Sequence, residues 1–410
     1  MAARILAQPV IPSSLRAEQL KRLSFLCGLP LTGRKDELIA RLTAAATTTA
    51  VPSPKKKSRP GPVVLSIDLG IRNLAFSLLT PVVVSSAPGP RKTTGAKSKK
   101  RDPSSASSSS SSSSSPSNRA GPPAINLHLW QRLSLLEGLS RPSGQKGNGE
   151  QDASDVGADT ETDAVAVAAA FSPAALAKTA NAFLRDTVLR LDPRPTHVLI
   201  ERQRWRSGGA AAIQEWTVRV NTLEAMLHAS LRTLRDVGAW DGDVVSVWPQ
   251  RVGQLFLGGA PDLASGDPPP PRAKRAKRAK RAAVAEGSDG AESEEKKKTR
   301  RSTRKSSSEI KKLKIQLLGS WLGQEGLVVR PDNPGARRMM DAYREALNGA
   351  GRGRSKRSAR AEAEGEGKGP ALDRKLDDLT DSLMQGMAWL RWQENMALLR
   401  REGGVEKLLE

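Results

Sequence analysis

Three groups of acidic residues lie at the ends of apolar segments, where the ligands of a catalytic metal are often found. Asp68 ends the apolar run Val-Val-Leu-Ser-Ile-Asp, and Glu201 ends a second run, His-Val-Leu-Ile-Glu. The third group begins a long apolar stretch near the C-terminus and contains Asp377, Asp378 and Asp381. A charged group in an apolar segment is costly unless it is paired or binds a metal.

Together these acids supply hard oxygen ligands, which suit Mg²⁺ or Mn²⁺. Two such ions about 4 Å apart can activate a water molecule and stabilise the leaving oxygen of a phosphodiester. Cys27 is the only cysteine and there are 3 histidines, so cysteine-based and histidine-rich metal centres are excluded. The acids therefore predict metal-dependent hydrolysis of a phosphodiester.

Each acidic group also has an ordinary structural explanation. Asp68 precedes Gly70 and could cap a turn, and Glu201 could pair with an arginine that follows it. The aspartates could simply favour the first turn of a helix through its dipole. Asp377 and Asp381 are four residues apart and Asp378 and Asp381 three, so either pair would share one helical face.

Hydrophobic periodicity predicts the elements that must position these acids. We expect strands over 63–69, 72–80, 125–136, 197–201 and 244–248, and helices over 172–191, 210–237, 310–322, 336–347 and 376–401. Three strands followed by alternating helices and strands predict an α/β fold, a mixed five-stranded sheet flanked by helices.

The predicted helix over 210–237 carries a long apolar stripe. The stripe contains Ile213, Trp216, Val220, Leu223, Leu227, Leu231 and Leu234. Two interpretations stay open, a core helix and a dimerisation element.

Low-complexity stretches rich in Ser, Pro, Gly and charged residues separate these elements. We expect insertions at about 85–123, 144–163, 262–308 and 349–369, and a linker over 46–61. Such stretches bury too little apolar surface to offset the entropy of ordering, so we predict that they are disordered. The catalytic domain would then span 62–402.

The formal net charge is +23, which indicates a polyanionic partner, with nucleic acid as the default. No apolar run approaches the length of a membrane span, so we expect no membrane association. We also expect no small-molecule cofactor.

Four segments resemble the fungal mitochondrial Holliday-junction resolvases, a branch of the RuvC-like nucleases with a ribonuclease-H-like fold. The segments are Ser66–Ala75, Ile200–Ser207, Glu215–Glu224 and Lys375–Leu383, in the order found in that family. The predicted order of strands and helices is also that of the ribonuclease-H-like fold.

The resemblance implies that Asp68, Glu201 and the C-terminal aspartates are the catalytic metal ligands, with two Mg²⁺ or Mn²⁺ ions expected per site. The choice between Asp377 and Asp378 stays open, and we expect Asp377 to act with Asp381. The resemblance further implies a homodimer that makes paired nicks across a four-way DNA junction, because an open junction has near two-fold symmetry. It also implies a mitochondrial location, although Ala-Lys-Arg repeats at 273–281 leave a nuclear location open.

A second resemblance covers residues 13–45, which look like a SAP motif, a short helical DNA-binding unit. Its small core would contain Leu20, Leu23, Leu38, Ile39 and Leu42. Arg34 and Lys35 at the start of its second helix would contact phosphate. A helical hairpin that binds a protein partner is the alternative.

Basic residues around the predicted site are candidates for holding DNA. Arg202, Arg204 and Arg206 follow Glu201, and we expect them to contact phosphates while Trp205 packs on a base or sugar. Arg72, after the first strand, is a further candidate, and the alternative for Trp205 is a place in the core.

Three functions follow from these observations. The first is a Mg²⁺-dependent endonuclease that resolves four-way junctions. The second is a non-catalytic DNA-binding protein on a degenerate nuclease scaffold. The third is a ribonuclease-H-like nuclease that cuts RNA–DNA hybrids.

Overall fold

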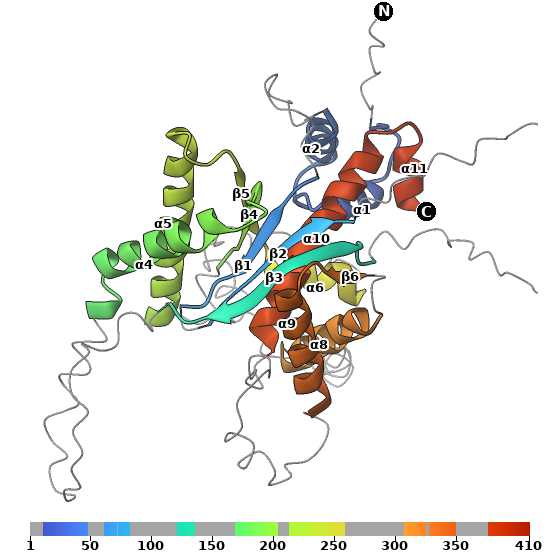
Figure 1. Cartoon of the computed structure of the whole chain (residues 1–410). Coiled ribbons are helices and arrows are strands. Elements are labelled where there is room, and N and C mark those ends of the chain that lie inside the picture. The colour runs from blue at the N-terminus through green and yellow to red at the C-terminus, as the bar shows by residue number, and fades with distance from the viewer. Residues whose placement is uncertain are drawn as a thin grey trace, which may run out of the picture.

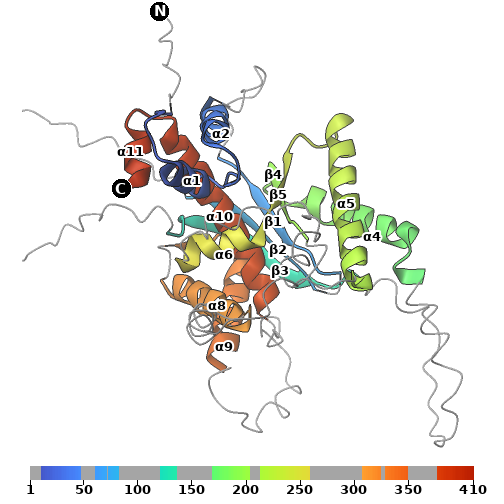
Figure 2. The same ribbon diagram turned by 180° about the vertical axis from the view of Figure 1, so that it is seen from behind.

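The computed structural model describes residues 11–47, 61–82 except Arg72, 121–135, 169–203, 213–258, 307–324, 328–349 and 376–410. Within these ranges a six-stranded sheet carries helices on both faces (Figure 1, Figure 2). The strands are β1 Val64–Asp68, β2 Leu74–Pro81, β3 Ile125–Leu133, β4 His197–Glu201, β5 Asp243–Val247 and β6 Val329–Pro331.

The strand order is β5-β4-β1-β2-β3-β6. Strands β1, β2 and β3 pair antiparallel, whereas β4 is parallel to β1 and β5 is parallel to β4. The predicted mixed α/β sheet is confirmed, but the predicted number of five strands is wrong. The additional strand, β6, pairs parallel to β3 and is only 3 residues long, which is too short for an alternating pattern to reveal.

Helices of two groups cover the two faces of the sheet. One face carries α4 (Pro173–Asp186), followed by a 3₁₀ turn over Val188–Arg190, and α5 (Glu215–Asp236). The other face carries α10 (Asp377–Leu399), which lies along β1 and β2. Around α10 are α6 Pro249–Leu257, α8 Ser307–Gly323, α9 Pro334–Gly349 and α11 Gly404–Leu409.

Helix α10 is buried around most of its girth, as its sequence predicts. Leu379, Leu383, Met384 and Met387 are all inaccessible to solvent. At Gly386 the helix approaches the sheet so closely that an added Cβ would lie 2.7 Å from Cδ2 of Leu79. This close packing fixes the acidic first turn of α10 relative to β1.

Helix α5 begins later than its apolar stripe suggests. Four members of the stripe, Val220, Leu223, Leu227 and Leu231, are buried against the sheet. Ile213 and Trp216 do not belong to this buried face, since their side chains are 41% and 40% exposed. Ile213 precedes the helix, and Trp216 in its first turn packs edgewise on Phe171 instead of on the sheet.

The N-terminal unit consists of α1 (Ala17–Leu26) and α2 (Lys35–Thr47), which confirms the predicted pair of helices. The predicted core residues Leu20, Leu23, Leu38 and Leu42 are fully buried, whereas Ile39 is half-buried. These residues do not form a separate core: they belong to the same apolar cluster as α10, α6 and α8. Both helices lie beside the C-terminal half of α10 and α11 (Figure 1, Figure 2).

The predicted low-complexity insertions lie outside the described residues except at their edges. Residues 307–308 begin α8 and residue 349 ends α9, so the helices extend slightly into the predicted insertions. Likewise α2 extends to residue 47, inside the predicted linker. None of the helices in the described part of the chain is long and apolar enough to cross a membrane.

Candidate active site

Asp68 and Glu201 lie side by side at the C-terminal ends of two neighbouring parallel strands. The register places Ile67 of β1 opposite Ile200 of β4, so the next residue on each strand is an acid. Their side chains share a hydrogen bond. The buried apolar residues before them hold both carboxyl groups at the same edge of the sheet.

The surroundings of Asp68 disfavour its ionised form. Burial raises the pKa of the Asp68 carboxyl well above its usual range, and the charge of Glu201 and the hydrogen bond to it raise the pKa further. The charges of Asp381 and Asp378 act in the same direction. Four carboxyl groups from β1, β4 and α10 therefore lie close enough for their charges to interact, and like charges repel unless a proton or a cation intervenes.

The first turn of α10 presents its aspartates differently. Asp378 and Asp381 are the two whose charges act on Asp68, and Oδ2 of Asp378 is fully shielded from solvent. Asp377 instead accepts a hydrogen bond from Nζ of Lys311, at 2.7 Å. The geometry thus favours the pair Asp378 and Asp381, three residues apart, over the expected pair Asp377 and Asp381.

Two lysines of α8 face the acidic turn and were not foreseen from the sequence. Nζ of Lys314, whose side chain is 12% exposed, forms an ion pair with Oδ1 of Asp381. Lys311 lies one turn earlier and forms an ion pair with Asp377. A lysine spacing of three residues is common in helices, so only the packing of α8 on α10 reveals this role.

Buried hydrogen bonds attach the first turns of α10 to the sheet. Nε2 of Gln385 donates to Oγ of Ser66 and to the carbonyl oxygen of Ile67, each at 3.2 Å. Oγ of Ser77 donates to the carbonyl of Ser382, and Nε1 of Trp130 to that of Leu379. The bond to Ile67 is adjacent to Asp68, so Gln385 ties the acid of β1 to those of α10.

The segment after Glu201 is attached to both neighbouring elements. The backbone nitrogen of Arg202 donates to the carbonyl of Val247 at 2.8 Å, and that of Gln203 donates to Oε2 of Glu224 at 3.1 Å. Burial raises the pKa of Glu224, and the charge of Glu201 adds to this effect. Glu224 ends one of the motifs recognised in the sequence, but its contact with this loop was not predicted.

Three of the predicted DNA-binding residues lie in the described part of the chain and four do not. Arg34 and Lys35 are exposed at the start of α2, on the N-terminal unit, and Arg202 is exposed beside the acidic site. Arg72, Arg204, Trp205 and Arg206 lie outside the described residues. The guanidinium of Arg202 lies over the ring of Trp248, 4.2 Å from its centre.

The acidic cluster suits a hard divalent cation by the chemistry of its donors, since all are carboxylates and they crowd around Asp68. The described side chains do not include three or more His, Cys, Asp or Glu residues already arranged to hold an ion. The repulsion that a cation would relieve is reduced here by two kinds of contact. Asp68 and Glu201 share a hydrogen bond, and the two lysines of α8 form ion pairs with Asp377 and Asp381.

The sequence matches the family model described as mitochondrial resolvase Ydc2 / RNA splicing MRS1 over residues 64–399. This match covers most of the chain, including the sheet and all four converging acids. The protein therefore belongs to this family of resolvases and RNA-splicing proteins.

One similar protein is the mitochondrial cruciform cutting endonuclease 1 of Schizosaccharomyces pombe, with 26% identity over 217 residues. That match covers 53% of this chain and 55% of the relative, so this chain spans about half the length of the curated relative it matches. The crystal structure of the yeast mitochondrial Holliday junction resolvase Ydc2 is 19% identical and superposes over 94% of this chain and 96% of its own, with a TM-score of 0.46.

Proposed function

We propose that this protein is a structure-selective DNA endonuclease that resolves four-way (Holliday) junctions in mitochondrial DNA recombination. The observation that carries the proposal is the convergence of Asp68, Glu201, Asp378 and Asp381 from two strand ends and one helix. Membership of a resolvase family and a relative named as a mitochondrial cruciform-cutting endonuclease support the substrate and the location.

Divalent cations, Mg²⁺ or Mn²⁺ and two per site, are proposed to be held by these four carboxylates. When bound, such ions activate water and stabilise the leaving oxygen of a phosphodiester. Lys314 would orient Asp381, and Gln385 would keep Asp68 at a fixed distance from α10. The protein would thus supply carboxylate oxygen donors that a cation draws together when it binds.

The DNA contacts are proposed to begin at Arg202, which is exposed next to Glu201. Arg72, Arg204 and Arg206 are expected to extend this phosphate-binding surface, with Arg34 and Lys35 of the N-terminal unit contacting a junction arm. The excess of basic residues in the whole chain would make this binding strongly dependent on salt concentration.

A homodimer is proposed because paired nicks need two active sites. Large apolar side chains are exposed around the start of α5, namely Ile213, Trp216 and Val218, each at least 40% accessible. Exposed large apolar side chains of this kind are candidates for a protein interface. Sedimentation should therefore give the mass of a dimer for the wild type and of a monomer for Val218→Asp; equal masses would remove this part of the proposal.

A cleavage assay tests the proposed activity. A synthetic four-way junction with Mg²⁺ should be cut into two nicked duplexes, and Asp68→Asn should lower the rate about 100-fold or more while junction binding persists. Duplex DNA of the same sequence is the control. An intact junction after incubation with the wild type, or normal cutting by Asp68→Asn, would refute the mechanism.

A non-catalytic nucleic-acid-binding role is the second candidate, because the family description also includes RNA splicing. The ion pairs of Lys311 and Lys314 with the acidic turn are compatible with a site that binds no cation. Calorimetric titration with Mn²⁺ separates the two candidates, since only the nuclease predicts heat of binding that Asp68→Asn abolishes. Comparing an RNA–DNA hybrid with the junction in the same cleavage assay tests the third candidate, a hybrid-specific ribonuclease.

A further inference from the structure

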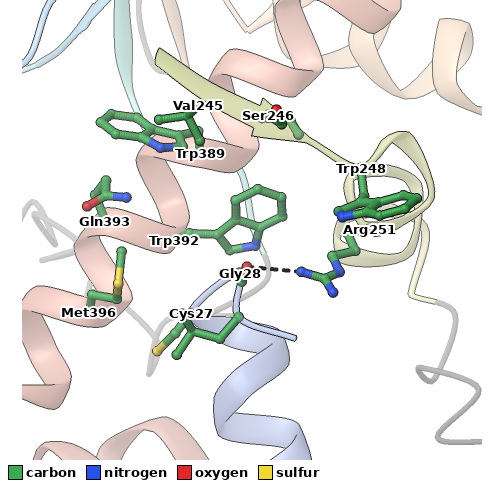
Figure 3. Close-up of a pocket in the computed structure, with 12 residues that line it drawn as sticks. Cys27, Gly28, Val245, Ser246, Trp248, Arg251, Trp389, Trp392, Gln393 and Met396 are labelled. Carbon is green, nitrogen blue, oxygen red and sulfur yellow. Dashed lines mark hydrogen bonds between the residues drawn. The ribbon is translucent and has the colours of Figure 1, made fainter. Parts of the chain in front are cut away.

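A cavity of about 150 Å³ lies where the N-terminal unit, α6, β5 and α10 meet. Three tryptophans line it, Trp248, Trp389 and Trp392, together with Arg251 of α6 (Figure 3). A cavity of about this volume can accept a six-membered aromatic ring. The size and the lining therefore suit a flat aromatic group better than an ion or a flexible alkyl chain.

Trp392 gives the cavity a hydrogen-bond donor. The side chain is 6% exposed, and within the described part of the chain its Nε1 is shielded from solvent without a hydrogen-bond partner. Figure 3 shows this nitrogen on the side where Arg251 donates to the carbonyl of Gly28. A buried indole N–H normally finds an acceptor, so the cavity is built for a ligand that carries one.

Gly28 packs directly against the ring of Trp392 at one side of the cavity. An added Cβ at Gly28 would lie 2.6 Å from the Trp392 ring, and the φ angle of 70° disfavours any other residue. Nη1 of Arg251 donates to the carbonyl oxygen of Gly28 at 3.2 Å. The N-terminal unit thus completes the cavity with backbone, held in place by a side chain of the catalytic domain.

One edge of the cavity is connected to the strand that carries Glu201. Val247 pairs with Glu201 across β5 and β4, and Trp248 follows Val247 directly. The guanidinium of Arg202, the residue after Glu201, lies over the ring of Trp248. Arg202 and Trp248 therefore connect the residue after Glu201 with the lining of the cavity.

We propose that this cavity binds one unstacked base of the DNA substrate, with the Trp392 N–H donating to a ring carbonyl. This inference rests on the proposed function, because it assumes a branched DNA in the neighbouring site. Bases beside a branch lose stacking partners, so moving one into a pocket costs least there. Stacking on aromatic side chains is the usual way in which proteins hold such bases.

The test uses four-way junctions in which each branch-adjacent base in turn is replaced by an abasic site, with binding measured by anisotropy in EDTA. Trp392→Phe keeps an aromatic ring, though a smaller one, and removes the N–H donor, and it should weaken binding of the intact junction about fivefold. At one abasic position the wild type and Trp392→Phe should bind equally. Trp240→Phe is the matched control, since Trp240 is buried outside the cavity and its Nε1 donates to Pro195.

A second variant guards against misfolding. Val245→Phe fills the cavity from β5 without removing a polar group, and it should weaken junction binding about tenfold while duplex binding is unchanged. Intact-junction binding equal to wild type in both variants, or a loss that persists at every abasic position, would overturn the base-binding pocket. Because these measurements need no metal, they stay separate from the cleavage assay: a wild type that binds but never cuts would refute the nuclease alone.

Discussion

At the scale of single residues, the site depends on carboxyl groups that repel one another. Asp68 and Glu201 could be singled out from the sequence because each ends an apolar strand, and neighbouring parallel strands bring such ends together. Glu224, Lys311 and Lys314 could not be singled out, because their importance comes from helix packing that no local pattern encodes.

The raised pKa of Asp68 predicts an unusual pH dependence of stability. A carboxyl whose pKa is higher in the folded than in the unfolded state contributes stability that is fully present below its ordinary pKa. That contribution is lost as pH rises through the raised value. In EDTA, the melting temperature of the wild type should therefore fall with rising pH relative to Asp68→Asn. If the melting temperatures of the two proteins change in parallel between pH 4 and 9, the prediction is contradicted.

The choice between adjacent aspartates gives a second prediction at this scale. Asp378→Asn should reduce junction cleavage about 100-fold or more, because the Asp378 charge acts directly on Asp68. Asp377→Asn should cost less than about tenfold, since it breaks a partly exposed ion pair with Lys311. Single-turnover rates on the same junction measure both, and the reverse ranking would restore Asp377 as the ligand.

At the scale of elements, α10 determines the geometry of the site. Its position could be predicted because its apolar residues extend around the whole helix, and the main strands could be predicted from their periodicity. Three shorter elements were missed: β6, α6 and α11 have between 3 and 9 residues and show too little of a repeat. Because α6 could not be predicted, the cavity that Arg251 of α6 lines with three tryptophans could not be predicted either.

Because α10 approaches the sheet so closely at Gly386, adding one methyl group there should lower the stability of the protein. Gly386→Ala should lower the free energy of unfolding by about 1–3 kcal/mol, because the new Cβ would overlap Leu79. Gly253→Ala on α6 is the control, since an added Cβ there meets nothing within 4 Å, and it should stabilise by about 0.4–1 kcal/mol. Urea denaturation measures both; equal stabilisation by the two substitutions would show that the contact is loose.

At the scale of the whole molecule, the N-terminal unit belongs to the same core as α10, α6 and α8. The SAP-like pattern predicted two helices correctly, but it could not reveal that their apolar side chains pack on α10 and α6. Polar contacts reinforce this packing, as Nδ2 of Asn395 donates to the carbonyl of Leu26 at 2.7 Å. The DNA-binding role of the unit remains a prediction.

A shared core predicts shared unfolding. Leu20→Ala should destabilise the protein by about 2–5 kcal/mol, since Leu20 is fully buried in the common cluster. Circular dichroism and tryptophan fluorescence should still report one coincident transition at a lower temperature. An early transition confined to the helical signal would instead mean that the N-terminal unit unfolds independently.

The docking of α1 and α2 on α10 also has a consequence for synthesis on the ribosome. The first two helices emerge several hundred residues before the helix that covers them, so their apolar faces stay without their native partner during most of translation. The same late helix carries two of the four acids. A chain interrupted before α10 would therefore lack both its finished core and half of the acids of the proposed active site.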